Sequence, residues 1–139
     1  IPKNYNFIDR DKELLDSFTI NLSKIRQCID NQNLNEYIKF IVDKSFDSNK
    51  YFNDCAPWSQ KDNLDRLNTI IYVSLEVIRK LSILLLPIIP KSAEKSLKSL
   101  NISISKITFE SISNHEFLKK GNDLNNQGIL FNKIVNKKP

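Results

Sequence analysis

Pro57 separates two long stretches of helical periodicity, and this interruption constrains the fold more than any other feature of the sequence. Apolar residues recur at three- and four-residue steps from Leu34 to Phe46 before it, and again from Leu64 to Leu85 after it. Because proline disfavours the α conformation at the preceding residue, the first helix should end at or just before Ala56. The sequence therefore predicts two long helices that meet at a corner, and the only tryptophan, Trp58, lies directly at that corner.

The rest of the chain continues this helical pattern. Only 2 glycines and 5 prolines occur in 139 residues, which is a poor supply of turn formers for many short strands. We expect a single all-α domain over 1–139, a helical bundle that ends in a short irregular strap. The expected helices cover about 9–30, 34–56, 62–86 and 91–100, and the strap covers about 102–135, with a short extended segment near Ile107 and a final apolar patch over 130–135 that folds back over the helices.

The helix over 62–86 is expected to lie at the centre, because its apolar residues form two adjacent stripes. One stripe contains Leu64, Leu67, Ile71, Ile78, Leu81 and Leu85, and the other contains Ile70, Val73, Val77 and Leu84. A helix with so wide an apolar arc is usually covered on more than one side. We therefore expect both stripes to belong to the core.

Several classes of protein are disfavoured by composition. Cys28 and Cys55 show no CxxC spacing and are accompanied only by His115, so no metal site is expected in this chain, and two isolated thiols indicate a reducing, cytoplasmic setting. The most apolar run, 81–90, is too short to span a bilayer, so no membrane partner is expected. The sequence contains no methionine, not even at position 1, which predicts a piece excised from a larger polypeptide.

The formal net charge of +5 is unevenly distributed along the chain. Residues 1–90 carry 12 basic and 12 acidic side chains, whereas residues 91–139 carry 9 basic and 4 acidic ones. If the helical part binds nucleic acid, neutralisation of phosphates is not its main device, and base stacking or hydrogen bonding must supply discrimination.

The decapeptide from Asn49 to Trp58, Asn-Lys-Tyr-Phe-Asn-Asp-Cys-Ala-Pro-Trp, resembles the Asn-Lys-Tyr … Ala-Pro-Trp segment of bacterial-type methionyl-tRNA synthetases. The resemblance continues in 72–79, in 84–90 with its Pro-x-x-Pro ending, and more weakly in Leu-Phe-Asn-Lys-Ile at 130–134. It implies the helical anticodon-binding fold of the class Ia aminoacyl-tRNA synthetases.

The resemblance also implies a function and a set of site residues. Trp58 matches the tryptophan that stacks on a base of the CAU anticodon in that family, and Pro57 fixes the corner. Asn49 and Tyr51 match motif positions and either contact RNA or shape the corner. The implied partners are the anticodon loop of methionine tRNA and a catalytic domain of the same polypeptide.

The chain departs from the full family pattern in ways that limit these expectations. It lacks the His-Ile-Gly-His and Lys-Met-Ser-Lys-Ser signatures, so no catalytic residue and no cofactor is expected here, and this chain alone should aminoacylate nothing. ATP is implied for the parent enzyme, and zinc is left open. The family helix that supplies an Asn and an Arg to anticodon reading is expected to precede this chain.

Three alternatives remain from the residues themselves. Spacing alone favours Trp58 as a core residue at the hinge, since tryptophan is usually well buried. An exposed corner or the basic tail could instead dock a protein, which would make the chain a helical protein-protein interaction module. A small enzyme that uses Cys28 or Cys55 with His115 is the weakest of the three, because no recognisable motif surrounds the pair.

Overall fold

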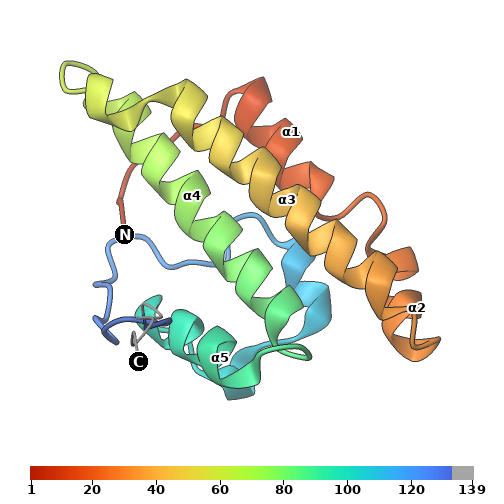
Figure 1. The fold of residues 1–139 in the computed structure, drawn as a ribbon. Helices are drawn as coiled ribbons and strands as arrows, with labels where there is room; N and C mark the ends of the chain where they lie inside the picture. The colour runs from red at the N-terminus through yellow and green to blue at the C-terminus, as the bar shows by residue number, and fades with distance from the viewer. Residues whose placement is uncertain (133–139) are drawn as a thin grey trace, which may run out of the picture.

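Helices account for all the regular structure in the computed structural model, which describes residues 1–132 (Figure 1). They are α1 (Asp9–Ser17), α2 (Leu22–Asp30), α3 (Leu34–Cys55), α4 (Leu64–Leu85) and α5 (Pro90–Ser99), with short 3-10 helices η1 (Pro57–Ser59), η2 (Ile104–Lys106) and η3 (Phe109–Ser113). No strand occurs within 1–132, and the all-α fold class is confirmed. The extended segment expected near Ile107 is limited to Ile107 and Thr108, whose backbone is extended between η2 and η3.

The helix expected over 9–30 is two helices, α1 and α2, which are separated by a turn over 18–21. The hydroxyl of Ser17 donates to the carbonyl of Leu14 and that of Thr19 to the carbonyl of Asp16, at 2.6 and 2.9 Å. Side chains of this kind compete with the helical backbone for hydrogen bonds, which explains the break. Phe18 is nevertheless fully buried, so the break preserves the apolar stripe that suggested one helix.

The core lies where α1, α3 and α5 pack against α4, with α2 packed on α3 and with α3 and α4 antiparallel (Figure 1). Of the two apolar stripes on α4, the one with Ile70, Val73, Val77 and Leu84 is buried. The other stripe is only partly covered: Leu64 and Ile78 are exposed, whereas Leu81 and Leu85 are half-buried and pack against the core, so the expectation that the whole stripe belongs to the core is wrong. A groove between α3 and α4 runs along Ile78 and Leu81 of this stripe.

The segment after α5 is held by charged side chains that are completely buried. Arg79 donates to the carbonyls of Ser111 and Asn114 and is paired with Glu76, at 2.8 Å between Arg79 Nε and Glu76 Oε2. Lys80 donates to the carbonyls of Ile112 and Asn114. Glu76 in turn accepts from the backbone amide of Leu118 at 2.7 Å. Side chains of α4 thus provide hydrogen-bond partners for the backbone of an irregular segment, which lacks the regular backbone hydrogen bonds of a long helix or a sheet.

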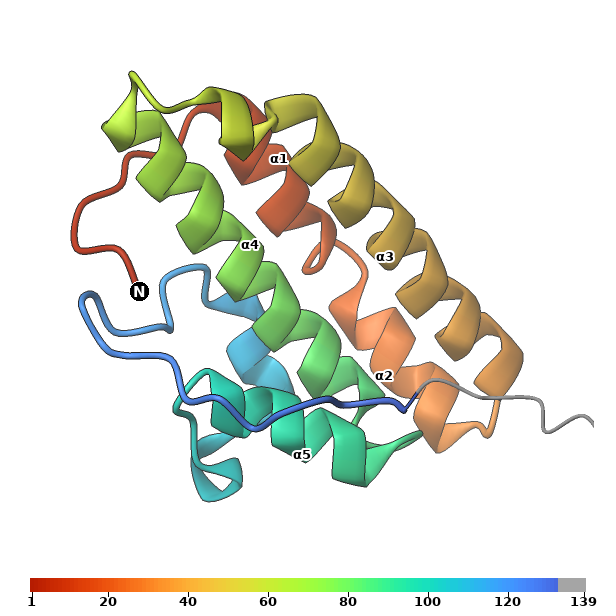
Figure 2. The same cartoon turned by 60° about the vertical axis from the view of Figure 1, so that its left-hand side comes forward.

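The last described residues form a strap that crosses α5 (Figure 2). The amide of Asn125 donates to the carbonyl of Ser99 at 2.8 Å, and Lys95 donates to the carbonyl of Ile129 at 3.0 Å. The apolar patch expected to be covered is not: Phe131 is 64% exposed, and residues 133–135 of that patch lie outside the described residues.

None of the helices described within 1–132 has the length and apolar character needed to cross a bilayer.

Candidate nucleic-acid interface

Pro57 determines the backbone conformation at the corner between α3 and α4. α3 ends at Cys55, and Ala56 adopts a left-handed conformation with φ +45° and ψ +65°, which is uncommon for a residue with a Cβ. Pro57 then starts η1, where its fixed φ and missing amide hydrogen are tolerated. The amide of Ser59 donates to the carbonyl of Ala56 at 2.8 Å, and the side chain of Gln60 donates to the carbonyl of Cys55 at 3.2 Å. The corner is therefore a defined turn.

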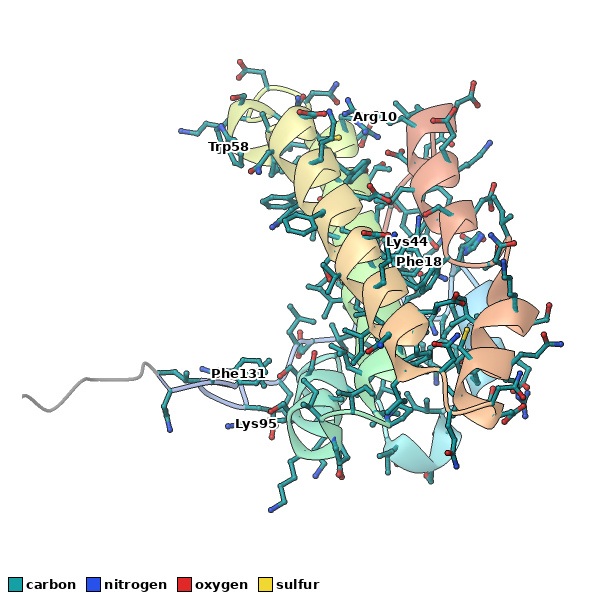
Figure 3. All side chains as sticks on the ribbon, turned by 45° about the vertical axis from the view of Figure 1, so that its right-hand side comes forward. Arg10, Phe18, Lys44, Trp58, Lys95 and Phe131 are labelled. Atoms are coloured by element: carbon teal, nitrogen blue, oxygen red, sulfur yellow. The ribbon has the colours of Figure 1, made fainter. Side chains whose placement is uncertain are left out.

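Trp58 lies on the outside of this turn, at the end of the bundle away from Phe131 and Lys95 (Figure 3). Its side chain is 58% exposed, whereas Pro57 beside it is buried. The indole packs against the ring of Phe52, with the ring centroids 6.0 Å apart and the planes inclined by 64°. The alternative in which Trp58 fills the core is therefore wrong, because most of the ring faces solvent from a rigid helix end.

Tyr51 lies on the inner side of α3 and is buried. Its hydroxyl donates to Asp11 Oδ1 at 2.6 Å, and burial, followed by the Asp11 carboxylate, raises the pKa of Tyr51. Asp11 also accepts hydrogen bonds from both terminal nitrogens of Arg66, with Nη1 2.7 Å from Oδ2 and Nη2 2.9 Å from Oδ1. Burial alone would raise the pKa of Asp11, but the hydrogen bonds from Arg66 and Tyr51 outweigh it and lower that pKa.

Asn49 lies one turn before Phe52 on the outer face of α3 and is exposed. Both residues line the groove between α3 and α4, an open space of about 380 Å³ that is lined mainly by apolar side chains with Ser45, Ser48 and Ser74. The amide of Asn49 can donate and accept hydrogen bonds on this side. Of the predicted site residues, Trp58 is exposed at the corner and Asn49 is exposed along the groove, while Pro57 is buried in the turn and Tyr51 points inward.

The charged side chains in the last turns of α3 are paired within the protein. Asp54 accepts from Arg10 at 2.7 Å and from Lys50 at 3.0 Å. The lysines of α5 lie beyond the other end of α4, a helix of 22 residues and about 33 Å in length. The lysines of α5 are consequently remote from Trp58, whose exposed indole gives the corner an aromatic surface.

The cysteines and the histidine are not brought together. Within 1–132, Cys28 Sγ lies 3.8 Å from Glu36 Oε2, and Cys55 Sγ lies 3.6 Å from Arg66 Nη2. His115 is placed between Lys80 and Asp16, at 3.0 and 2.8 Å. In this part of the chain no group of three or more His, Cys, Asp or Glu side chains is arranged to hold a metal ion.

Three residues at the corner were not singled out from the sequence, namely Asp11, Phe52 and Arg66. Asp11 resembles an ordinary acid at a helix start, and its burial depends on partners 40 and 55 positions away. Phe52 could have been identified from the sequence as a residue of the corner, since it lies inside the motif and six residues before Trp58.

The whole chain, residues 1–139, matches the family described as "Anticodon binding domain of methionyl tRNA ligase". The methionine–tRNA ligase of Methanosphaera stadtmanae is 32% identical over 146 residues, which cover 96% of this chain and 22% of that protein. The methionine–tRNA ligase of Thermotoga maritima is 31% identical over 126 residues, which cover 89% of this chain and 20% of that protein.

Solved structures agree with these sequence relatives. The apo form of Mycobacterium tuberculosis methionyl-tRNA synthetase superposes with a TM-score of 0.88 at 27% identity, over 99% of this chain and 28% of that one. The same enzyme bound by methionyl-adenylate gives 0.81 at 28% identity, over 90% of this chain and 25% of that one. The chain spans 20–28% of the proteins it matches here, and it belongs to the family of methionyl-tRNA ligase anticodon-binding domains.

Proposed function

We propose that this chain recognises the anticodon loop of methionine tRNA, with the indole of Trp58 stacked on an anticodon base. The observation that carries the proposal is the exposed indole on a rigid corner, in a chain that belongs to an anticodon-binding family. Stacking of an unpaired base on an aromatic ring contributes about 1–3 kcal/mol and is the common way in which proteins hold single-stranded RNA.

The other predicted residues take different roles in this proposal. Pro57 ends α3 and sets the turn that presents the indole. Asn49, which is exposed one turn below Phe52, is the candidate for a hydrogen bond to the RNA. Tyr51 shapes the corner from inside, since its hydroxyl is already bonded to Asp11.

The activity of the whole protein is proposed from its relatives. The relatives are methionine–tRNA ligases, and one solved neighbour is bound by methionyl-adenylate. We place ATP-dependent charging of methionine tRNA in a catalytic domain of the same polypeptide, in the cytoplasm. ATP, and zinc if the parent holds it, are assigned to that part of the polypeptide, and this chain is expected to charge no tRNA by itself.

A pair of substitutions tests the stacking role. Trp58→Phe keeps an aromatic face and Trp58→Leu removes it, while the exposed position limits any effect of either change on folding. We expect Trp58→Leu to weaken binding of a CAU anticodon stem-loop by about 5- to 150-fold, the equivalent of one stacked base, and Trp58→Phe to weaken it less. Equal affinities for the three proteins would contradict the proposal.

One observation favours the alternative of a protein interaction module. The groove between α3 and α4 exposes apolar side chains, among them Ile78 and Phe52, in an arrangement that fits the apolar face of a helix. Trp58 borders this groove through its contact with Phe52. If Trp58 fluorescence responded to an amphipathic helix and not to RNA, this second role would replace the first.

A further inference from the structure

Asp11 lies in the first turn of α1, yet its side chain is completely buried and accepts four hydrogen bonds. The amide of Ile8 donates to Oδ2 at 3.0 Å, Tyr51 donates to Oδ1, and Arg66 donates to both oxygens. A buried carboxylate is stable only when its oxygens are satisfied in this way. The carboxylate therefore joins three separate elements of the fold at one point.

Two of these elements are the helix ends on either side of the corner. Tyr51 lies in the last turns of α3, and Arg66 lies in the first turn of α4. Arg66 also reaches Cys55, the last residue of α3, with its Nη2 3.6 Å from Sγ. Asp11 thus contacts one residue before the corner and one after it, and both contacts are short and charge-assisted.

Other restraints near the corner are the Arg10–Asp54 ion pair, the contact between Trp58 and Phe52 and the packing of α3 on α4. The backbone hydrogen bonds of the corner between 56 and 63 are local, such as Gln60 to Pro57 at 3.1 Å and Asn63 to Gln60 at 3.0 Å. Local bonds shape the turn, but they do not fix the distance and angle between the ends of α3 and α4. The Asp11 cluster ties both helix ends to one buried carboxylate, in addition to the packing of α3 on α4.

We propose that Asp11 is a positioning residue for RNA recognition: through Tyr51 and Arg66 it holds the ends of α3 and α4 at the separation that presents Trp58 to a base. This inference rests on the proposed function. The charge of Asp11 is essential to the role, because Arg66 donates to both carboxylate oxygens, and an asparagine in either orientation would direct its NH₂ donor at one of the two Arg66 nitrogens.

A double-mutant cycle tests the role with a CAU stem-loop as the RNA. The proteins are the 139-residue chain, Asp11→Asn, Trp58→Leu and the double variant, and the dissociation constant is measured for each. We expect Asp11→Asn to weaken binding by a factor no larger than that of Trp58→Leu, and we expect no further loss in the double variant, because both changes remove the same stacking interaction. Independent, multiplicative effects would overturn the positioning role.

Two further variants separate positioning from general loss of stability. Leu84→Ala removes a buried side chain at the far end of α4 and is expected to lower the melting temperature without changing RNA affinity. Tyr51→Phe removes a single hydroxyl from the cluster, so it tests the same link in a fold that is barely altered, and it should increase the local motion of Trp58 in time-resolved fluorescence anisotropy. Unchanged anisotropy and affinity in Tyr51→Phe and Asp11→Asn would overturn the inference.

The outcomes also distinguish this inference from the proposal beneath it. If Trp58→Leu binds the stem-loop as tightly as the unchanged chain, the proposed function fails and the positioning role fails with it. If Trp58→Leu weakens binding and Asp11→Asn does not, only the positioning role fails.

Discussion

The indole of Trp58 meets the ring of Phe52 in an edge-to-face contact, with centroids 6.0 Å apart, while 58% of the Trp58 side chain stays exposed. Aromatic pairs of this geometry contribute about 0.5–1.5 kcal/mol beyond the area they bury. Phe52 thus restrains the indole and leaves much of its surface available to a ligand.

Replacement of Phe52 by alanine should release Trp58. We expect a red shift in Trp58 emission and weaker binding of the anticodon stem-loop, because the indole loses its restraint before it meets a base. Phe46→Ala is the matched control, since Phe46 is also on α3, is 69% exposed and is not stacked on Trp58. If the two variants gave the same emission spectrum, the support from Phe52 would be refuted.

Two isoleucines of α4 test which apolar stripe forms the core. Ile70 is fully buried and Ile78 is 43% exposed. Ile70→Ala should lower the free energy of unfolding by about 2–5 kcal/mol, and Ile78→Ala by less than about half of that, because the second change leaves no enclosed cavity. Urea denaturation measures both, and equal losses would contradict the packing described for α4.

The buried pair between Glu76 and Arg79 should be essential for stability. Arg79→Met leaves the Glu76 carboxylate buried without its partner, which should cost about 3–5 kcal/mol of unfolding free energy. Arg26→Met is the control, because the Arg26–Glu110 pair is exposed and its loss should leave the melting curve unchanged. A wild-type melting temperature for Arg79→Met would show that this pair does not hold the segment after η3.

Stability should also depend on the protonation of His115. Burial, followed by the neighbouring ammonium of Lys80, lowers the pKa of His115, and burial and then Arg79 lower the pKa of Lys80 to about 7. The unfolded chain therefore binds the His115 proton more tightly than the folded chain does. The free energy of unfolding should fall as the pH drops through about 6.5, the ordinary histidine pKa, toward the lower pKa of the folded state.

The test of this pH dependence compares the unchanged chain with His115→Gln, which cannot titrate in that range. Urea denaturation at a series of pH values should show a steeper loss of stability below a pH of about 6.5 in the unchanged chain than in the variant, in which Lys80, with a pKa of about 7, still contributes near neutral pH. Parallel profiles would show that His115 is not responsible. As His115 is the only histidine, its ring resonances report the pKa directly.

Much of the fold follows from local patterns in the sequence. The periodicity around Ile41 and Val73 indicated α3 and α4, and Pro57 marked the end of α3, because these signals depend on neighbours within one helix. The turn after Ser17 was missed, since Phe18 continues the apolar stripe across it. Which stripe of α4 is covered was also missed, because coverage depends on where other helices pack.

The residues of the candidate site also differ in whether the sequence could identify them. Trp58 and Pro57 were identified from a contiguous motif, and the exposure of Trp58 could be read only from the structure. Asp11 and Arg66 had no local signal, because their partners are brought together by the fold over 40 positions or more. The same holds for Arg79 and Lys80, which are buried and donate to backbone carbonyls of η3 more than 30 positions away.

The most direct test of the central claim is a titration of Trp58 fluorescence with a methionine-tRNA anticodon stem-loop, beside the same stem-loop with its first anticodon base changed. Because Trp58 is the only tryptophan, the emission reports on the corner alone. We predict that the CAU loop quenches the emission and that the altered loop quenches it much less. No quenching by either loop, or equal quenching by both, would contradict recognition of the anticodon by this corner.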